Sequence, residues 1–175
     1  MLIDLSELFF VEGKEKNYSI PLELEVFHLG TNDYQVAKKG TVELSIANQG
    51  GRVFAVTGRT ALELWIPCAR CLELVRVPVS LDIDQELNLS ETSEDRLAEL
   101  DEQFYLKGCN LDIDQLVISE LTLNLPMRVL CQPNCKGICN RCGVNLNRGS
   151  CDCDRQSLDP RMSVIQDIFK QLKEV

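Results

Sequence analysis

The chain has no long hydrophobic run and no recognisable N-terminal leader. Charged residues interrupt each apolar stretch before it reaches the roughly 18 consecutive apolar residues of a membrane-spanning helix. The opening MLIDLSELFF has an acid at position 4, and it has neither a basic segment nor a small-residue cleavage site, so it does not resemble a signal peptide. The sequence therefore predicts a cytoplasmic protein with no membrane partner, in which thiols stay reduced.

Histidine, glycine-rich segments and positive charge are also scarce. His28 is the only histidine and is far in sequence from every pair of cysteines, so a Cys–His nucleophile or a histidine general base has little to build on. Acids outnumber bases by 27 to 18, and the net charge of −9 opposes diffuse attraction to nucleic acid. We therefore expect no enzymatic activity and no small-molecule substrate, and any RNA contact must be local.

Cysteine, in contrast, is abundant, with nine in 175 residues. Six lie within 23 residues near the C-terminus: Cys131, Cys135, Cys139, Cys142, Cys151 and Cys153. Cys68 and Cys71 form a separate C-x-x-C motif upstream. Cys109 has no partner cysteine nearby, and we expect it to be a core residue. In a reducing compartment, cysteines clustered in this way more often bind metal than form disulfides.

The first half of the chain has the alternating pattern of half-buried antiparallel strands. Apolar and polar residues alternate through Thr41–Ala47, Arg52–Trp65 and Leu72–Leu87, with a turn at residues 48–51. The pattern predicts a meander of three to five antiparallel strands. We expect an α+β fold in which two helices pack on this sheet.

The helices and the domain boundary follow from charge and capping signals. Eight acids against one base predict a solvated acidic loop over residues 84–102. A packing helix is predicted over 112–125, with Asp112 and Gln115 as a capping box and Pro126 after its end, and a second helix from Asp159. We expect a β scaffold over residues 1–126, and a cysteine-rich, zinc-ordered lobe with the C-terminal helix over 127–175.

The spacing of the C-terminal cysteines favours zinc. Cys139 and Cys142 are spaced to chelate one ion, and Gly143 permits the turn in which backbone N–H groups point at the sulfurs. Cys151 and Cys153 can fold back to complete a closed tetrahedral site. A second site is predicted from Cys68, Cys71, Cys131 and Cys135, which gives one or two zinc ions in all. The alternatives are that Cys68 and Cys71 are merely small buried residues, or that Cys131 and Cys135 compete for the first ion.

Two redox interpretations stay open beside zinc. Cys135, Cys139 and Cys142 have the C-x3-C-x2-C spacing of radical S-adenosylmethionine enzymes, but those proteins place it early in a large β/α barrel. An iron–sulfur cluster would use the same cysteines. Cys68 and Cys71 have the spacing of a disulfide exchanger, although the strand-like context does not match a thioredoxin-type motif.

Several motifs together resemble the bacterial YceD family, the large ribosomal RNA subunit accumulation proteins. They are Cys68-x-Arg70-Cys71 at a strand end, Leu125-Pro126, the string C-K-G-I-C-N-R-C-G-V-N-L-N over residues 135–147, Cys151-x-Cys153 and Asp159-Pro160-Arg161. The resemblance runs from the first C-x-x-C to the C-terminus. It implies a non-enzymatic ribosome biogenesis factor that supports the synthesis, processing or stability of large-subunit (23S) ribosomal RNA.

The cysteine-rich segment also carries local positive charge. Lys136, Arg141 and Arg148 are candidates to contact RNA phosphates, with Asn145 and Asn147 as hydrogen-bond partners for sugar or base. The same cations could instead neutralise the negative charge of thiolate-bound zinc. Expected partners are ribosomal RNA, a large-subunit precursor or a ribosomal protein. The acidic stretch suggests a variant, a chaperone that holds a basic ribosomal protein.

Overall fold

The computed structural model describes residues 1–89 and 104–153. It divides the chain into two compact units. The first consists of Met1–Pro67 and Leu74–Val129, and the second of Cys68–Glu73 and Leu130–Val175. The second unit thus includes the short loop Cys68–Glu73. The single domain boundary predicted from the sequence, between residues 126 and 127, places this loop with the scaffold.

Nine strands, all paired antiparallel, occur in the described parts of the chain. Six form the main sheet: β2 (Glu15–Pro21), β3 (Val26–Leu29), β4 (Asn32–Lys38), β5 (Thr41–Gly50), β6 (Val53–Pro67) and β7 (Leu74–Asn88). The remaining three form a small sheet: β1 (Leu2–Asp4), β8 (Leu106–Lys107) and β9 (Asn110–Asp112). The expected antiparallel scaffold is therefore confirmed, with more strands than the three to five that the pattern indicated.

The main sheet is not a simple meander, because β6 has three partners. Its strand order is β2-β5-β6-β4-β3, and β7 also pairs with β6. β6 is 15 residues long and pairs with β7 over its whole length, from Val53↔Asn88 to Pro67↔Leu74. β5 and β4 each pair with only part of it. A strand of this length can pair with two shorter strands, one after the other along the same edge. The alternation of apolar and polar residues does not reveal such pairing.

The first part of the predicted acidic loop is a strand. β7 continues to Asn88, so Asp84 and Glu86 lie on it and not in a loop. They alternate with Ile83 and Leu87, which are buried, and this period of two keeps the acids on the solvent side. The rest of the acidic segment, residues 90–103, lies outside the described residues, as does the helix predicted from Asp159.

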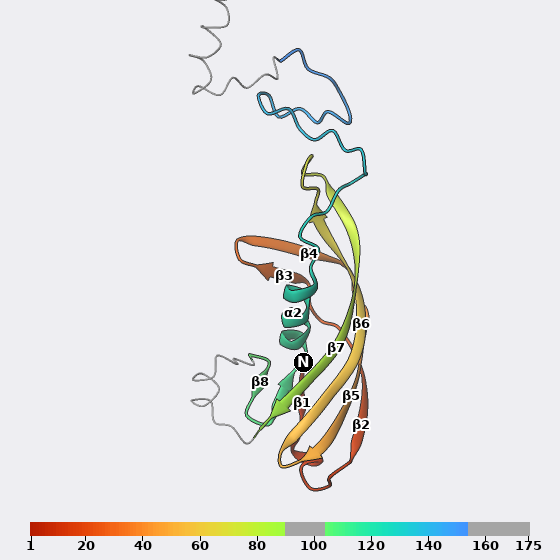
Figure 1. The fold of residues 1–175 in the computed structure, drawn as a ribbon, viewed down its shortest axis with the longest axis vertical. Coiled ribbons are helices and arrows are strands. Elements are labelled where there is room, and N and C mark those ends of the chain that lie inside the picture. Colours follow the sequence, from red (N-terminus) through yellow and green to blue (C-terminus); the bar gives the residue numbers. More distant parts are fainter. Residues whose placement is uncertain (90–103, 154–175) are drawn as a thin grey trace, which may run out of the picture. The chain divides into compact units, whose positions relative to one another are not determined.

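A single α-helix occurs in the described parts of the chain, α2 (Ile113–Asn124), beside the short 3-10 helix η1 (Ser6–Leu8). It lies against the main sheet at β7, and its start adjoins β9 (Figure 1). Its inward side chains Ile113, Leu116, Val117 and Leu121 are buried with the inner face of the sheet. This helix falls within the range 112–125 expected from the sequence.

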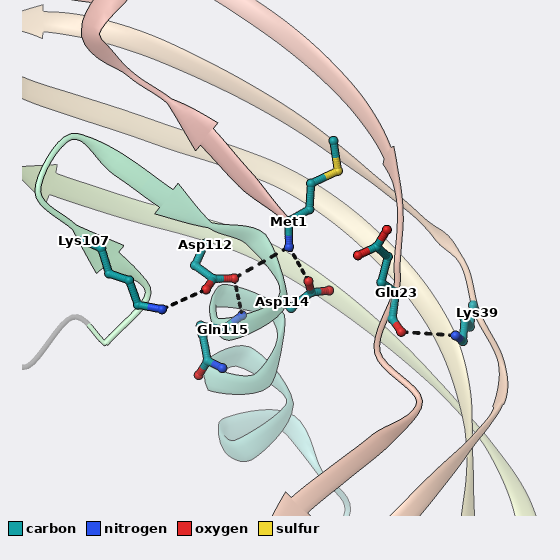
Figure 2. A network of polar contacts seen from close by, with 7 residues as sticks. All are labelled: Met1, Glu23, Lys39, Lys107, Asp112, Asp114 and Gln115. Carbon is teal, nitrogen blue, oxygen red and sulfur yellow. Dashed lines mark hydrogen bonds and ion pairs between the residues drawn. The ribbon is translucent and has the colours of Figure 1, made fainter.

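The N-terminus of α2 is held by a polar network (Figure 2). Asp112 is the N-cap and accepts a hydrogen bond from the backbone N–H of Gln115 at 3.5 Å, as its position predicts. The terminal amine of Met1 forms an ion pair with Asp114, and Lys107 contacts Asp112 at 3.3 Å. These contacts fasten β1 to the start of the helix. None of the helices described here has the length and apolarity to cross a bilayer.

Candidate metal centres

Two groups of four cysteines gather in the second unit. Cys68, Cys71, Cys131 and Cys135 form cluster A, and Cys139, Cys142, Cys151 and Cys153 form cluster B. Within each cluster, all four sulfur atoms lie within 4.8 Å of one another. All nine cysteines of the chain are free thiols. The structure therefore brings together the two sets that the sequence grouped.

Cluster A joins the loop between β6 and β7 to a segment some 60 residues further along the chain. The sulfur of Cys68 lies 3.8 Å from that of Cys135, and the sulfur of Cys71 lies 3.5 Å from that of Cys131. The side chain of Arg70 adds a hydrogen bond to the backbone carbonyl of Cys135, at 2.8 Å. The loop Cys68–Glu73 thus contacts this segment through two close sulfur–sulfur approaches and through the hydrogen bond from Arg70 to the backbone of Cys135.

Each cluster begins with the same tight turn. The backbone N–H of Arg70 points at the sulfur of Cys68, and that of Arg141 points at the sulfur of Cys139, both at 3.5 Å. The residue after each C-x-R-C motif has a left-handed backbone, Leu72 with φ of 63° and Gly143 with φ of 73°. Its N–H donates to the carbonyl of the first cysteine, at 3.0 Å in cluster A and 2.9 Å in cluster B. The two motifs therefore adopt the same knuckle conformation, which could present both cysteines of each motif to one metal ion.

Leu72 is the residue that sequence reasoning missed in this turn. A leucine in the left-handed region is strained, because its Cβ crowds the following carbonyl oxygen. Glycine occupies the corresponding position of cluster B without that penalty. The strain is tolerated because contacts around cluster A, among them the hydrogen bond from the Leu72 N–H to the Cys68 carbonyl, fix the backbone there.

Asn147 supports cluster A from the segment that follows cluster B's first pair. Its side-chain amide donates to the sulfur of Cys135 at 3.2 Å. Its carbonyl oxygen accepts from the backbone N–H of Lys136 at 2.7 Å and from the side chain of Gln132 at 3.2 Å. The sequence suggested Asn147 as an RNA contact, but these bonds occupy both ends of its amide. The neighbouring Asn145 is used similarly, since its carbonyl accepts from the N–H of Asn147 at 2.9 Å.

Burial and hydrogen bonding separate the thiols of each cluster. Burial raises the pKa of Cys68, but backbone N–H groups of its turn outweigh burial and bring the pKa down to about 6. Backbone N–H groups, first that of Cys142, lower the pKa of Cys139 to about 6. Burial raises the pKa of Cys131 to about 12, and the contact with Cys142 raises that of Cys153 to about 12. Each cluster therefore combines a thiol that ionises readily with one that keeps its proton until a cation offsets the charge of its neighbours.

The spacing fits one ion per cluster. Four thiolates at roughly 2.3 Å from a central zinc stand roughly 3.8 Å apart along the edges of a tetrahedron, and the sulfur contacts of 3.5 and 3.8 Å in cluster A are close to that value. In a [4Fe–4S] cluster each of the four thiolates binds a different iron, and in a [2Fe–2S] cluster the two pairs of thiolates bind different irons, which places sulfurs on different irons further apart than ligands of a single ion. A tetrahedral set of four sulfurs suits a mononuclear metal such as zinc.

The clusters differ in exposure. In cluster A, Cys68, Cys71 and Cys135 are buried, whereas in cluster B only Cys139 is buried and Cys142 is exposed.

Cys109, expected in the core, is exposed and belongs to neither cluster. It lies in the turn between β8 and β9, where Gly108 has a φ of 64° and the Cys109 carbonyl accepts from the N–H of Leu5 at 2.9 Å.

The candidate RNA-binding residues are all exposed in the second unit. Lys136 and Arg141 have no ion pair among the described residues, whereas Arg148 pairs with Glu73 at 2.5 Å. Part of the positive charge is therefore used within the unit, by a carboxylate and not by the thiolates.

Comparison with known proteins gives a family for this chain. The model of the family described as "Large ribosomal RNA subunit accumulation protein YceD" matches residues 56–170. An uncharacterized protein of Mycobacterium tuberculosis is 34% identical over 91 residues, which are 52% of this chain and 44% of that protein.

Two plant relatives are named "Large ribosomal RNA subunit accumulation protein YCED homolog 1, chloroplastic". The Arabidopsis thaliana protein is 30% identical over 64 residues, 37% of this chain and 20% of its own length. The Zea mays protein is 30% identical over 92 residues, 52% of this chain and 28% of its own length. The chain thus spans less than half of the length of these curated relatives.

No solved structure matches the chain significantly. The family match covers more than half of the sequence and includes all eight clustered cysteines. The chain belongs to the YceD family.

Proposed function

We propose that this protein is a non-enzymatic ribosome biogenesis factor that supports the synthesis, processing or stability of large-subunit (23S) ribosomal RNA. Membership of a family described by large-subunit RNA accumulation is the observation that carries this proposal. The plant relatives bear the same description in their names. We place its action in the cytoplasm, as the sequence predicts.

The metal in each cluster is zinc, and its role is structural. Each cluster offers four thiolates, which fill a tetrahedral coordination shell and leave no open position for a substrate or an activated water. Cluster A ties the loop Cys68–Glu73 to the segment after Leu130, and cluster B orders the following turn. Cys68 and Cys71 serve as ligands in this scheme and are buried, which disfavours the thiol-redox alternative.

Direct RNA contact is made through phosphates, by Lys136 and Arg141 with Arg148. The segment from Met127 to Cys153 has no aromatic side chain on which a base could stack, so base-stacking recognition has no platform there. A zinc ion with four thiolates has a formal charge of −2, which weakens the attraction further. The contact should therefore be modest, salt-dependent and insensitive to RNA sequence.

Cosedimentation with large-subunit precursors tests this proposal. The full chain should sediment with precursor particles, and ribonuclease treatment should release it. Lys136→Gln with Arg141→Gln should weaken the association, whereas Lys14→Gln with Arg52→Gln, an equal loss of charge in the first unit, should not. Absence of any association with precursor particles would refute the proposal.

The second candidate is a chaperone for a basic ribosomal protein. It is favoured by the acids Glu43, Asp82 and Asp84 on the exposed face of the main sheet. Association that survives ribonuclease and follows these acids, and not the cations of the second unit, would favour this candidate over direct RNA binding.

A further inference from the structure

The outer face of the main sheet carries the acids that favour the second candidate function, and the RNA contact of the leading proposal does not use it. Along β5, β6 and β7, one set of alternating side chains is buried under α2 and the small sheet, and the other set is exposed. Cross-strand register places Glu43, Arg59 and Asp82 in one row on the exposed face. Thr57 and Asp84 form the adjoining row.

Three adjoining hollows make a groove along this face. The first has a volume of about 670 Å³ and shares Glu43 and Arg59 with the second, of about 280 Å³. The second shares Ala61 and Ser80 with the third, of about 470 Å³. From Thr57 to Glu63 the groove follows β6 for roughly 20 Å, at roughly 3.3 Å per residue. It can accommodate an extended segment of about six residues.

The groove carries an uneven charge. Its first half is bordered by Glu43, Asp82 and Asp84 around the single cation Arg59. In the described parts of the chain, these three acids have no ion pair. The second half is bordered by Glu63 and by two cations, Lys38 and Lys39. The acidic half is therefore the end that would receive positive charge.

We propose that this groove binds an extended, lysine- or arginine-rich segment of a partner protein, with its basic half over Asp82 and Asp84. Alternate residues of an extended chain point to the same side and repeat roughly every 6.6 Å. Asp82 and Asp84 are themselves alternate residues of one strand and so offer the same repeat to a bound segment. The small side chains of Ala61 and Ser80 leave room for its backbone. The acidic border repels RNA, which makes polypeptide the favoured occupant.

Fluorescence anisotropy with a labelled decapeptide tests the proposal on the full chain. The first half of the probe alternates lysine with serine, and the second half contains only serine and alanine. The variant Glu43→Gln/Asp82→Asn/Asp84→Asn should weaken binding about tenfold. The variant Glu12→Gln/Glu23→Gln/Asp33→Asn, with the same change of net charge outside the groove, should change binding less than threefold.

A steric variant separates the groove from general electrostatics. Ala61→Tyr keeps the charge, suits a strand and fills the floor, so it should also weaken binding. Equal losses in the two charge variants, unchanged binding in Ala61→Tyr, or no binding by the unmodified chain would overturn the proposal. It would also be overturned if Ala61→Tyr dissociated a dimer of the chain in sedimentation, because a second copy would then be the occupant. None of these outcomes bears on the zinc clusters or on RNA association.

Discussion

Replacing Asn147 with alanine should weaken metal binding at cluster A. The substitution removes the amide donor to the sulfur of Cys135 at 3.2 Å and the acceptor of the Lys136 N–H at 2.7 Å. It also removes the contact with Gln132. Hydrogen bonds of this kind contribute about 1 kcal/mol each, and rehydration of exposed groups recovers part of the loss. A net loss of about 2 kcal/mol corresponds to about 30-fold in metal affinity.

The pH at which cluster A loses its metal provides a second measure of the effect of Asn147→Ala. Burial raises the pKa of Cys135, but the bond from Asn147 and other donors outweigh it, so the pKa lies below its usual value. Without the amide, the thiol holds its proton to a higher pH, and loss of metal on acidification should begin at a higher pH than in the unmodified chain. Metal affinity is measured by competition with a chromogenic chelator over a range of pH.

Asn140→Ala is the matched control, because Asn140 is an exposed asparagine in the same unit. It should leave the affinity within twofold of the unmodified chain. If Asn147→Ala also stayed within twofold, the supporting role assigned to Asn147 would be wrong. A normal metal affinity combined with impaired RNA association would restore its original interpretation as an RNA contact.

Three further predictions concern the backbone and the two units. Gly143→Ala should destabilise the second unit by about 1 kcal/mol because φ is 73° there, whereas Leu72→Gly should not destabilise it, since it removes a strained leucine; chelator titration of zinc release measures both. Gly58→Ala should lower the free energy of unfolding of the first unit by about 2–3 kcal/mol, since its Cβ would lie 2.2 Å from the carbonyl oxygen of Glu43. Denaturant melts should show this loss with unchanged metal content. Chelation should allow trypsin to cleave after Lys136, whose side chain is already exposed but whose backbone N–H is held by Asn147. The β-sheet circular dichroism signal should persist, and its collapse would show that the sheet also depends on metal.

Cluster B could be predicted because it depends on local chemistry, and cluster A follows from the four paired cysteines that remain. Cys139 and Cys142 are close enough in sequence to chelate one ion, and the turn formers before Cys151 allow the chain to fold back. Helix α2 was equally accessible, since Asp112 caps it through a contact three residues away. Signals of this range survive without knowledge of the tertiary structure.

The missed features depend on long-range pairing. β6 pairs with β5, β4 and β7 because it is long and because the register of β4 shifts between Val36 and Lys38. The alternation of apolar and polar residues encodes neither feature. Residues 84–87 fell in two overlapping predictions, a strand through Leu87 from alternation and an acidic loop from composition, and the structure supports the strand, with the acids on its solvent face. Asn147 looked available for RNA, because its bond to Cys135 joins residues on opposite sides of the second knuckle.

Metal stoichiometry tests the central claim most directly. Elemental analysis and native mass spectrometry of the full chain should find two zinc ions per molecule, with no inorganic sulfide and no visible absorption. Cys68→Ser and Cys142→Ser should each retain one ion, because each removes a ligand from a different cluster. A single ion in the unmodified chain, loss of both ions in either variant, or a coloured iron–sulfur protein would contradict two independent four-cysteine zinc sites.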